Sequence, residues 1–122
     1  MWLWVTAGAA AGASLRLALS LWLHTPVYGN LAANWLGCFL AGLVLAVSWH
    51  TALPDAVKYG LSVGFLGSLT TFSAFSAEWV GALLNGRWAA AGAVFLLHTA
   101  GGALWTLLGV GAVYGLKRFI VD

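Results

Sequence analysis

The chain has 122 residues, of which 62% are hydrophobic and 7% are charged, and its formal net charge is +2. Because soluble domains carry about 25% charged residues, this composition excludes a soluble globular protein and predicts a membrane protein. Five Lys and Arg residues against three Asp and Glu residues make no basic patch, so we expect a lipid bilayer as partner and no nucleic acid.

Four segments are long and apolar enough to cross a bilayer, which takes about 20 mostly apolar residues for each helix. They cover about residues 2–23, 27–49, 56–84 and 88–116, and short connections that contain Pro or Gly join them. The sequence therefore predicts an all-α membrane protein in which residues 1–122 form a single transmembrane domain of four helices.

The first two predicted helices each carry one notable polar residue. Arg16 interrupts the first, where it either extends to the membrane interface or attracts anions to a vestibule. Asn34 lies in the middle of the second, where its amide either donates to an anion in a pore or forms a hydrogen bond between helices. Cys38, the single cysteine, is interpreted as a small packing residue.

The third predicted helix contains the segment 67–78, Gly-Ser-Leu-Thr-Thr-Phe-Ser-Ala-Phe-Ser-Ala-Glu, which is unusually polar for membrane depth. Polar groups in lipid are costly, so this cluster is a functional-site hypothesis. Gly67, Ser68, Thr70 and Thr71 are poor helix formers. Two interpretations stay open: a local break whose freed carbonyls are buried or bind a cation, or an unbroken helix whose hydroxyls bond to the preceding turn.

Other residues of the last two helices suggest no catalytic site. Glu78 is the only carboxylate within a predicted helix, where it either pairs with a cation or a backbone donor or lies near the headgroups. A single carboxylate makes no acid–base pair, so we expect no enzyme. His98 is interpreted as a hydrogen-bonded interior residue. Thr99 and Thr106 are expected to bond back to their own helix.

The few loop charges give a weak prediction of orientation. Lys58, Lys117 and Arg118 share one side of the predicted membrane and Arg87 lies on the other, while Asp122 sits beside two of these cations. This small excess favours cytoplasmic termini by the positive-inside rule. A bias so small is also compatible with insertion both ways up.

Glycine pairs spaced four residues apart predict closely packed helices. The pairs are Gly8/Gly12, Gly60/Gly64 and Gly111/Gly115. Such spacing lets helix backbones approach closely in lipid. Since four short helices enclose little interior, a polar pathway is easier to build between two subunits, and we expect a homo-oligomer, most simply a dimer.

Three blocks of the sequence resemble the Fluc (CrcB) fluoride channels. They are residues 64–78, Gly12-Ala13-Ser14-Leu15-Arg16, and Gly29-Asn30-Leu31-Ala32-Ala33-Asn34-Trp35-Leu36-Gly37. The blocks follow the family's order in a chain of the family's length, so the resemblance covers essentially the whole protein.

This resemblance implies a fluoride-selective channel that exports fluoride passively from a prokaryotic cytoplasm. It implies antiparallel, dual-topology homodimers of four-helix subunits in the cell membrane, with two fluoride pores along the dimer interface. It also implies a central structural sodium ion, held by backbone carbonyls of a broken third helix. By motif position those carbonyls belong to Gly67 and Thr70.

The resemblance also implies roles for individual side chains. Phe72 and Phe75 match the paired pore phenylalanines, Asn34 matches the pore asparagine, and Arg16 matches the arginine of the first helix. Thr71 and Ser73 stand at motif positions as well.

A polar track on the fourth helix aligns with positions 94, 98, 102 and 106, and here the chain departs from the family. Thr106 keeps a hydroxyl, whereas Val94 and Gly102 offer no side-chain donor. His98 replaces a hydroxyl with an imidazole, which would serve as an anion-facing donor, more strongly when protonated.

Two other classes are weaker interpretations of the same sequence. Proton-coupled exporters of the small multidrug resistance type are also four-helix, dual-topology dimers of this length. They require a carboxylate in the first helix, where this chain has Arg16 and no Asp or Glu. A non-conducting assembly factor would explain the glycines but not the cluster of hydroxyls and phenylalanines.

Overall fold

The computed structural model describes the backbone of residues 1–121 and the side chains of residues 1–118, so Asp122 lies outside the described residues. The elements in chain order are α1 (Trp2–Trp22), α2 (Pro26–Ser48), α3 (Asp55–Tyr59), the π-helix η1 (Gly60–Leu66), α4 (Gly67–Leu69), α5 (Phe72–Leu84) and α6 (Trp88–Val121). Four stretches are long and apolar enough to cross a membrane: Trp2–Trp22, Pro26–Ser48, Asp55–Leu84 and Trp88–Arg118. The prediction of an all-α protein with four such helices is confirmed.

The fourth helix is longer than predicted. It was expected to end near residue 116, but α6 continues to Val121. Lys117 and Arg118 are good helix formers, and neither Gly nor Pro follows them to end the helix.

Local signals set the ends of the helices. Thr25 caps α2 by accepting a hydrogen bond from the backbone N–H of Tyr28 at 3.2 Å, and Pro26 occupies the first turn, where its missing N–H costs nothing. His24, with φ of +57°, turns the chain from α1 into α2. Gly86, with φ of +67°, turns it from α5 into α6, in a conformation that glycine adopts without strain.

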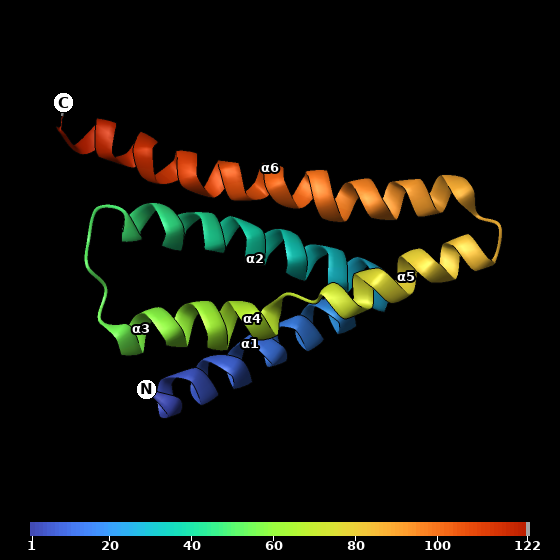
Figure 1. Cartoon of the computed structure of the whole chain (residues 1–122), viewed down its shortest axis with the longest axis horizontal. Helices are drawn as coiled ribbons and strands as arrows, with labels where there is room; N and C mark the ends of the chain where they lie inside the picture. The colour runs from blue at the N-terminus through green and yellow to red at the C-terminus, as the bar shows by residue number, and fades with distance from the viewer. Residues whose placement is uncertain (122) are drawn as a thin grey trace.

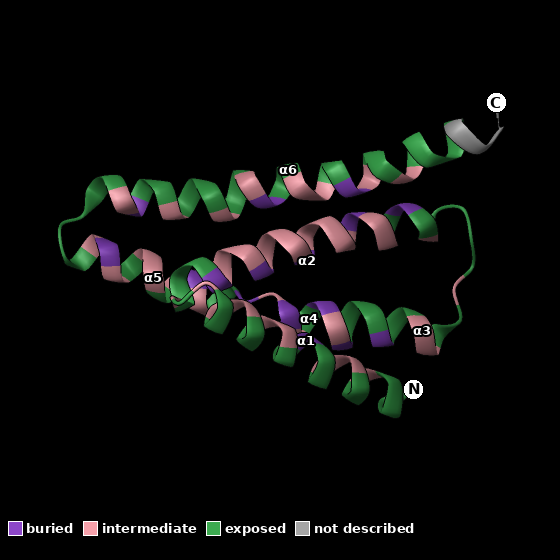
Figure 2. Cartoon of the chain, turned by 180° about the vertical axis from the view of Figure 1, so that it is seen from behind, coloured by how far each residue is buried: buried purple, intermediate pink, exposed green. Residues whose placement is uncertain are grey.

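The four spans run alternately up and down. Figure 1 shows both termini at the same end of the molecule as the α2–α3 connection, with the α1–α2 and α5–α6 connections at the opposite end. In Figure 2 the buried residues lie where helices face one another, and most of the remaining surface is exposed. Large apolar side chains such as Trp2, Trp22 and Leu84 are 74–85% exposed, as lipid-facing residues of a multi-pass membrane protein are.

Glycines bring α1 against η1. A Cβ at Gly8 would overlap the carbonyl oxygen of Gly60, and a Cβ at Gly12 would overlap that of Phe65. From the other side, Gly64 lies against the backbone of Val5. Two of the three predicted glycine pairs therefore form a single contact between backbones.

The third predicted pair does not pack within the chain. A Cβ at Gly111 or Gly115 would meet nothing within 4 Å. The close approach of α2 to α6 uses Gly42 and Gly109 instead, which are placed so that a Cβ would meet backbone atoms of the facing helix. Gly42 and Gly109 belong to no pair of glycines four residues apart, so this spacing did not point to them.

Candidate functional site

The third span is broken in the middle of the molecule. Thr70 (φ −84°, ψ 153°) and Thr71 (φ −145°, ψ 112°) are extended between α4 and α5. Of the two interpretations of this segment, the local break is the one observed. Hydroxyls also bond to the preceding turn, because Thr70 Oγ1 donates to the Leu66 carbonyl at 2.9 Å. Thr71 then caps α5 by accepting from the Ala74 N–H at 3.2 Å.

Asn34 on α2 satisfies the backbone of the break. Its Oδ1 accepts from the Thr71 N–H at 2.7 Å, and its Nδ2 donates to the Thr71 carbonyl at 3.1 Å. The side-chain amide thus pairs with the N–H and the carbonyl of Thr71, two backbone groups that are costly to leave unpaired in an apolar interior. Because the Thr71 N–H is used in this way, the Gly67 carbonyl lacks the partner that it would have in an unbroken helix.

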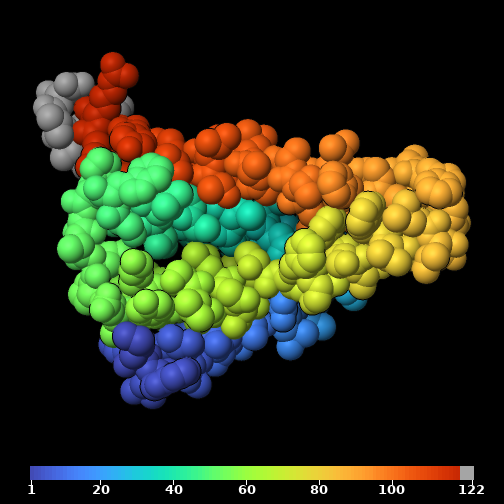
Figure 3. All heavy atoms as spheres, viewed as in Figure 1, coloured from blue at the N-terminus to red at the C-terminus, as the bar shows by residue number. Residues whose placement is uncertain are grey.

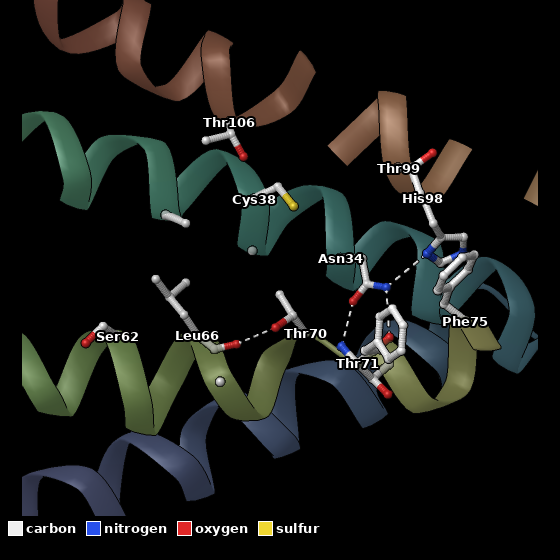
Figure 4. A pocket seen from close by; sticks show the side chains of 14 residues that line it. Asn34, Cys38, Ser62, Leu66, Thr70, Thr71, Phe75, His98, Thr99 and Thr106 are labelled. Carbon is white, nitrogen blue, oxygen red and sulfur yellow. Dashed lines mark hydrogen bonds between the residues drawn. The ribbon is translucent and has the colours of Figure 1, made fainter. Parts of the chain in front are cut away.

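A second set of polar contacts joins α2, α5 and α6 beside the break. Asn30 Nδ2 donates to Glu78 Oε1 at 2.8 Å, and His98 Nε2 lies 3.8 Å from Glu78 Oε2. His98 Nδ1 lies 3.0 Å from Asn34 Nδ2 (Figure 4). The neighbours of Glu78 are therefore side chains of two other helices, whereas a cation, a backbone donor or the headgroups were the alternatives for it. The interpretation of His98 as a hydrogen-bonded interior residue is confirmed.

The Asn30–Glu78 pair escaped the sequence analysis. The available signal was the four-residue spacing of Asn30 and Asn34, which places both amides on one face of α2. That spacing gives no information about the partner, since Glu78 is 48 positions away from Asn30.

Phenylalanine rings flank the polar contacts. The ring centroids of Phe72 and Phe75 are 5.5 Å apart in an edge-to-face arrangement, so the prediction that they share a face is confirmed. Phe75 is 7% exposed and stacks on His98 at 5.0 Å, whereas Phe72 is 78% exposed. One ring is therefore part of the interior, and the other stands on the surface of the chain.

These groups line a cavity of about 500 Å³ that opens on one face of the chain. Its lining consists of Asn34, Gly37, Cys38 and Ala41 from α2, Ser62, Leu66, Gly67, Thr70, Thr71, Phe72 and Phe75 from the third span, and His98, Thr99 and Thr106 from α6. Figure 3 shows the surface hollowed between α2 and the α3–α4 segment. In Figure 4 Asn34 stands at the centre of the lining residues, between the break and α6.

Most of the predicted site residues meet at this cavity. Ser73 lies beside it, with its Oγ 3.2 Å from Thr71 Oγ1. Arg16 lies on α1 outside the lining. Thr99 and Thr106 bond back to Phe95 and Gly102 as predicted, although both also line the cavity.

Ser62 and Cys38 also line the cavity, although no role was predicted for Ser62 and only packing for Cys38. Cys38 follows Asn34 by four positions and so shares its face of α2, a signal that was available. Ser62 lies in the π-helix η1, whose altered periodicity conceals which face its residues occupy.

These features define a multi-pass α-helical membrane protein whose third span is interrupted beside a cavity lined by amide, hydroxyl and aromatic groups. The chain belongs to the family described as CrcB-like protein, Camphor Resistance (CrcB), whose model matches residues 3–110.

Relatives over nearly the whole length carry a functional name. A protein of Chromohalobacter salexigens named fluoride-specific ion channel FluC is 44% identical, with 97% of this chain and 96% of the relative aligned. Proteins of the same name from Thiobacillus denitrificans and Histophilus somni are 45% and 41% identical, with 90% and 87% of both chains aligned.

Proposed function

We propose that this protein is a fluoride-selective ion channel, not an enzyme, that exports fluoride passively across a prokaryotic plasma membrane. Family membership and the name shared by the relatives support the substrate. The observation within the chain that carries the proposal is the cavity beside the break, where Asn34, Thr71 and two phenylalanines meet. In an acidic medium HF crosses membranes and dissociates inside, so a leak for the anion lowers internal fluoride.

The chemistry of the lining suits a small, strongly hydrated anion. An anion that sheds water needs substitute donors, which amide N–H and hydroxyl groups supply. The edges of the Phe72 and Phe75 rings carry positive partial charge because of the aromatic quadrupole. Neutral dipoles and ring edges attract an anion without the tight binding of a fixed cation, and conduction requires sites that an ion can leave.

An antiparallel, dual-topology homodimer completes two such pores in the proposal. Phe72 is 78% exposed at the mouth of the cavity, which opens on one face of the chain. The amide and hydroxyl groups of the lining are costly to leave facing lipid, and a second copy of the chain would close the cavity into a pathway. Arg16 would attract anions at a vestibule, and Ser73, Thr71, His98 and Thr106 would contribute to the lining.

A structural sodium ion between the two subunits also belongs to the proposal. Carbonyl oxygens are the ligands that broken membrane helices offer to Na⁺. Gly67 and Thr70 fit this role because the break removes helical partners from this segment, with the Thr71 N–H bonded to Asn34 instead. When bound, the ion would supply positive charge that holds the carbonyl dipoles of both subunits together at the dimer axis.

Ion flux from liposomes tests the channel proposal directly. Purified protein in KF-loaded vesicles should release fluoride rapidly when valinomycin balances the charge, as a fluoride electrode measures. Vesicles loaded with KCl should release chloride far more slowly. Equal rates for the two anions, or a fluoride rate no higher than that of protein-free vesicles, would reject the assignment.

A further inference from the structure

We propose that His98 is a positioning residue that holds the Asn34 amide, and not an anion donor of a track along α6. The inference rests on the proposed function, because it concerns how one group of the pore lining is oriented. It concerns this chain in particular, since an imidazole stands where the family resemblance implies a hydroxyl.

The contacts of Asn34 settle the direction of its hydrogen bond with His98. Thr71 N–H can only donate and the Thr71 carbonyl can only accept, so the amide has one possible orientation, with Nδ2 as its donor. His98 Nδ1, 3.0 Å from that Nδ2, is therefore an acceptor. A neutral imidazole that accepts through Nδ1 carries its proton on Nε2.

The other side of the ring gives the same assignment independently. His98 Nε2 faces Glu78 Oε2 at 3.8 Å, and that oxygen is buried without a hydrogen-bond partner among the described residues. The second carboxylate oxygen is held by Asn30 Nδ2 at 2.8 Å. A proton on Nε2 points toward the oxygen that lacks a donor, so the Glu78 end agrees with the tautomer that the Asn34 end fixes.

Packing holds the ring in this orientation. The His98 side chain is 5% exposed and stacks on Phe75 with centroids 5.0 Å apart and planes 29° apart. Glu78 of α5 is the charged group that faces it, while α2 presents the amides of Asn30 and Asn34 and, one turn further on, the thiol of Cys38. A ring flip would lose both polar contacts at once.

This arrangement decides what Asn34 offers to the pore. Both N–H groups of Nδ2 already have acceptors, one in the Thr71 carbonyl and one in His98 Nδ1. An anion that reaches Asn34 therefore shares or takes the N–H directed at His98. His98 sets the direction of that N–H and satisfies it when no anion is present.

Substitution of His98 by Asn or by Gln tests the roles of the two ring nitrogens separately. In His98→Asn the new side-chain oxygen would overlie the Nδ1 position, so this variant keeps an acceptor for Asn34 and loses the contact with Glu78. In His98→Gln the longer side chain reaches the Nε2 position, so this variant keeps a donor for Glu78 and loses the acceptor. The free energy of one buried hydrogen bond corresponds to about a tenfold change in an equilibrium constant, here that between oriented and misoriented Asn34. We therefore expect fluoride efflux from liposomes to be about tenfold higher for His98→Asn than for His98→Gln.

Two results would contradict the positioning role of His98. A ratio below about threefold, or a His98→Ser channel that conducts at least as well as His98→Asn, would overturn the positioning role and favour a track donor. Size-exclusion profiles and thermal stability of each variant show whether flux falls in folded protein. His50→Asn and His50→Gln are the matched controls, because His50 is exposed beyond the end of α2 and contacts Tyr114 instead.

A spectroscopic test does not depend on transport. The ¹⁵N spectrum of imidazole-labelled protein in nanodiscs should show an unprotonated Nδ1 and a protonated Nε2 for His98, and Asn34→Ala should shift the Nδ1 signal. A protonated Nδ1, or no response to Asn34→Ala, would overturn the inference while leaving the channel assignment intact. Wild-type vesicles that do not conduct fluoride would instead reject the proposed function.

Discussion

Two regions of helix contact in this protein are built by opposite means. Where α1 meets η1, glycines such as Gly12 remove side chains so that backbones touch. Beside the break, where α2 meets α5 and part of α6, side chains of Asn34, Glu78 and His98 cross the space between helices as hydrogen-bonding groups. Further along, Gly42 and Gly109 bring α2 and α6 together. The first contact brings backbones together, whereas the second borders the polar cavity.

The difference shows how a small membrane protein separates support from function. Contacts between backbones in lipid are stabilised by van der Waals packing and do not depend on any particular polar group. Polar contacts at membrane depth are costly to leave unmade, so each one fixes the position of its partners. The glycine contact holds the first half of the third span, and the polar contacts hold the second half at the orientation that lines the cavity.

The largest expected effect comes from removing the side chain that joins the break to α2. Asn34→Ala leaves the N–H and carbonyl of Thr71 without partners, which costs about 1–3 kcal/mol for each group. Asn34→Asp keeps an acceptor for the Thr71 N–H but loses both donors and adds a negative charge. We expect Asn34→Ala to lower both thermal stability and fluoride efflux, and Asn34→Asp to lower efflux with a smaller loss of stability. Full efflux in either variant would contradict a pore role for Asn34.

A substitution at the glycine contact should give the next largest effect, which is a loss of stability without a loss of efflux. Gly12→Ala places a methyl group on the Phe65 carbonyl, and overpacking of this kind costs about 1–3 kcal/mol. Thermal unfolding in detergent should show the loss, with efflux per folded protein unchanged. Gly111→Ala is the matched control, because among the described residues a Cβ there would meet no atom of another helix within 4 Å. Equal stability of the two variants would show that α1 and η1 do not depend on backbone contact.

Substitutions of Phe72 and Phe75 compare an exposed and a buried ring of the same site. Phe75→Ile should lower both stability and efflux, because Phe75 is 7% exposed and contacts His98. Phe72→Ile should lower efflux alone, because Phe72 is 78% exposed on the chain. Efflux assays beside thermal melts separate the two effects. Unchanged efflux in Phe72→Ile would remove that ring from the pore.

The smallest expected effect concerns two threonine caps of the same geometry. Thr71 caps α5 and Thr25 caps α2, each with its hydroxyl 3.2 Å from a backbone N–H. Replacing either with Ala should cost about 1 kcal/mol of stability. Only Thr71→Ala should change fluoride efflux, since Thr71 lies at the cavity. An equal effect on efflux from both caps would mean that helix stability, and not the site, limits conduction.

Much of the fold could be predicted because lipid imposes a simple rule. Uninterrupted apolar segments must become helices there, so hydropathy and length located all four spans. Four poor helix formers close together marked the break, although intrinsic preference left an unbroken helix equally open. The end of α6 was misplaced because no Gly or Pro marks it.

The site was predictable only where residues lie close in sequence. Phe72 and Phe75 share a helical face by their spacing, and the structure places them edge to face. Glu78 and Asn30 come from different helices, and no local pattern pairs them. The same limit applied to the glycine pairs, where Gly111 and Gly115 have the right separation but face no other part of the chain.

The sequence by itself determined that the chain is a four-span membrane protein with a polar interruption in the third span, because bilayer thickness and the cost of polar groups in hydrocarbon act on each segment separately. Only the tertiary structure decided that Asn34 closes the break and that His98 accepts a hydrogen bond from it. Hydrogen bonds between helices depend on direction and distance, and packing of the whole bundle sets both.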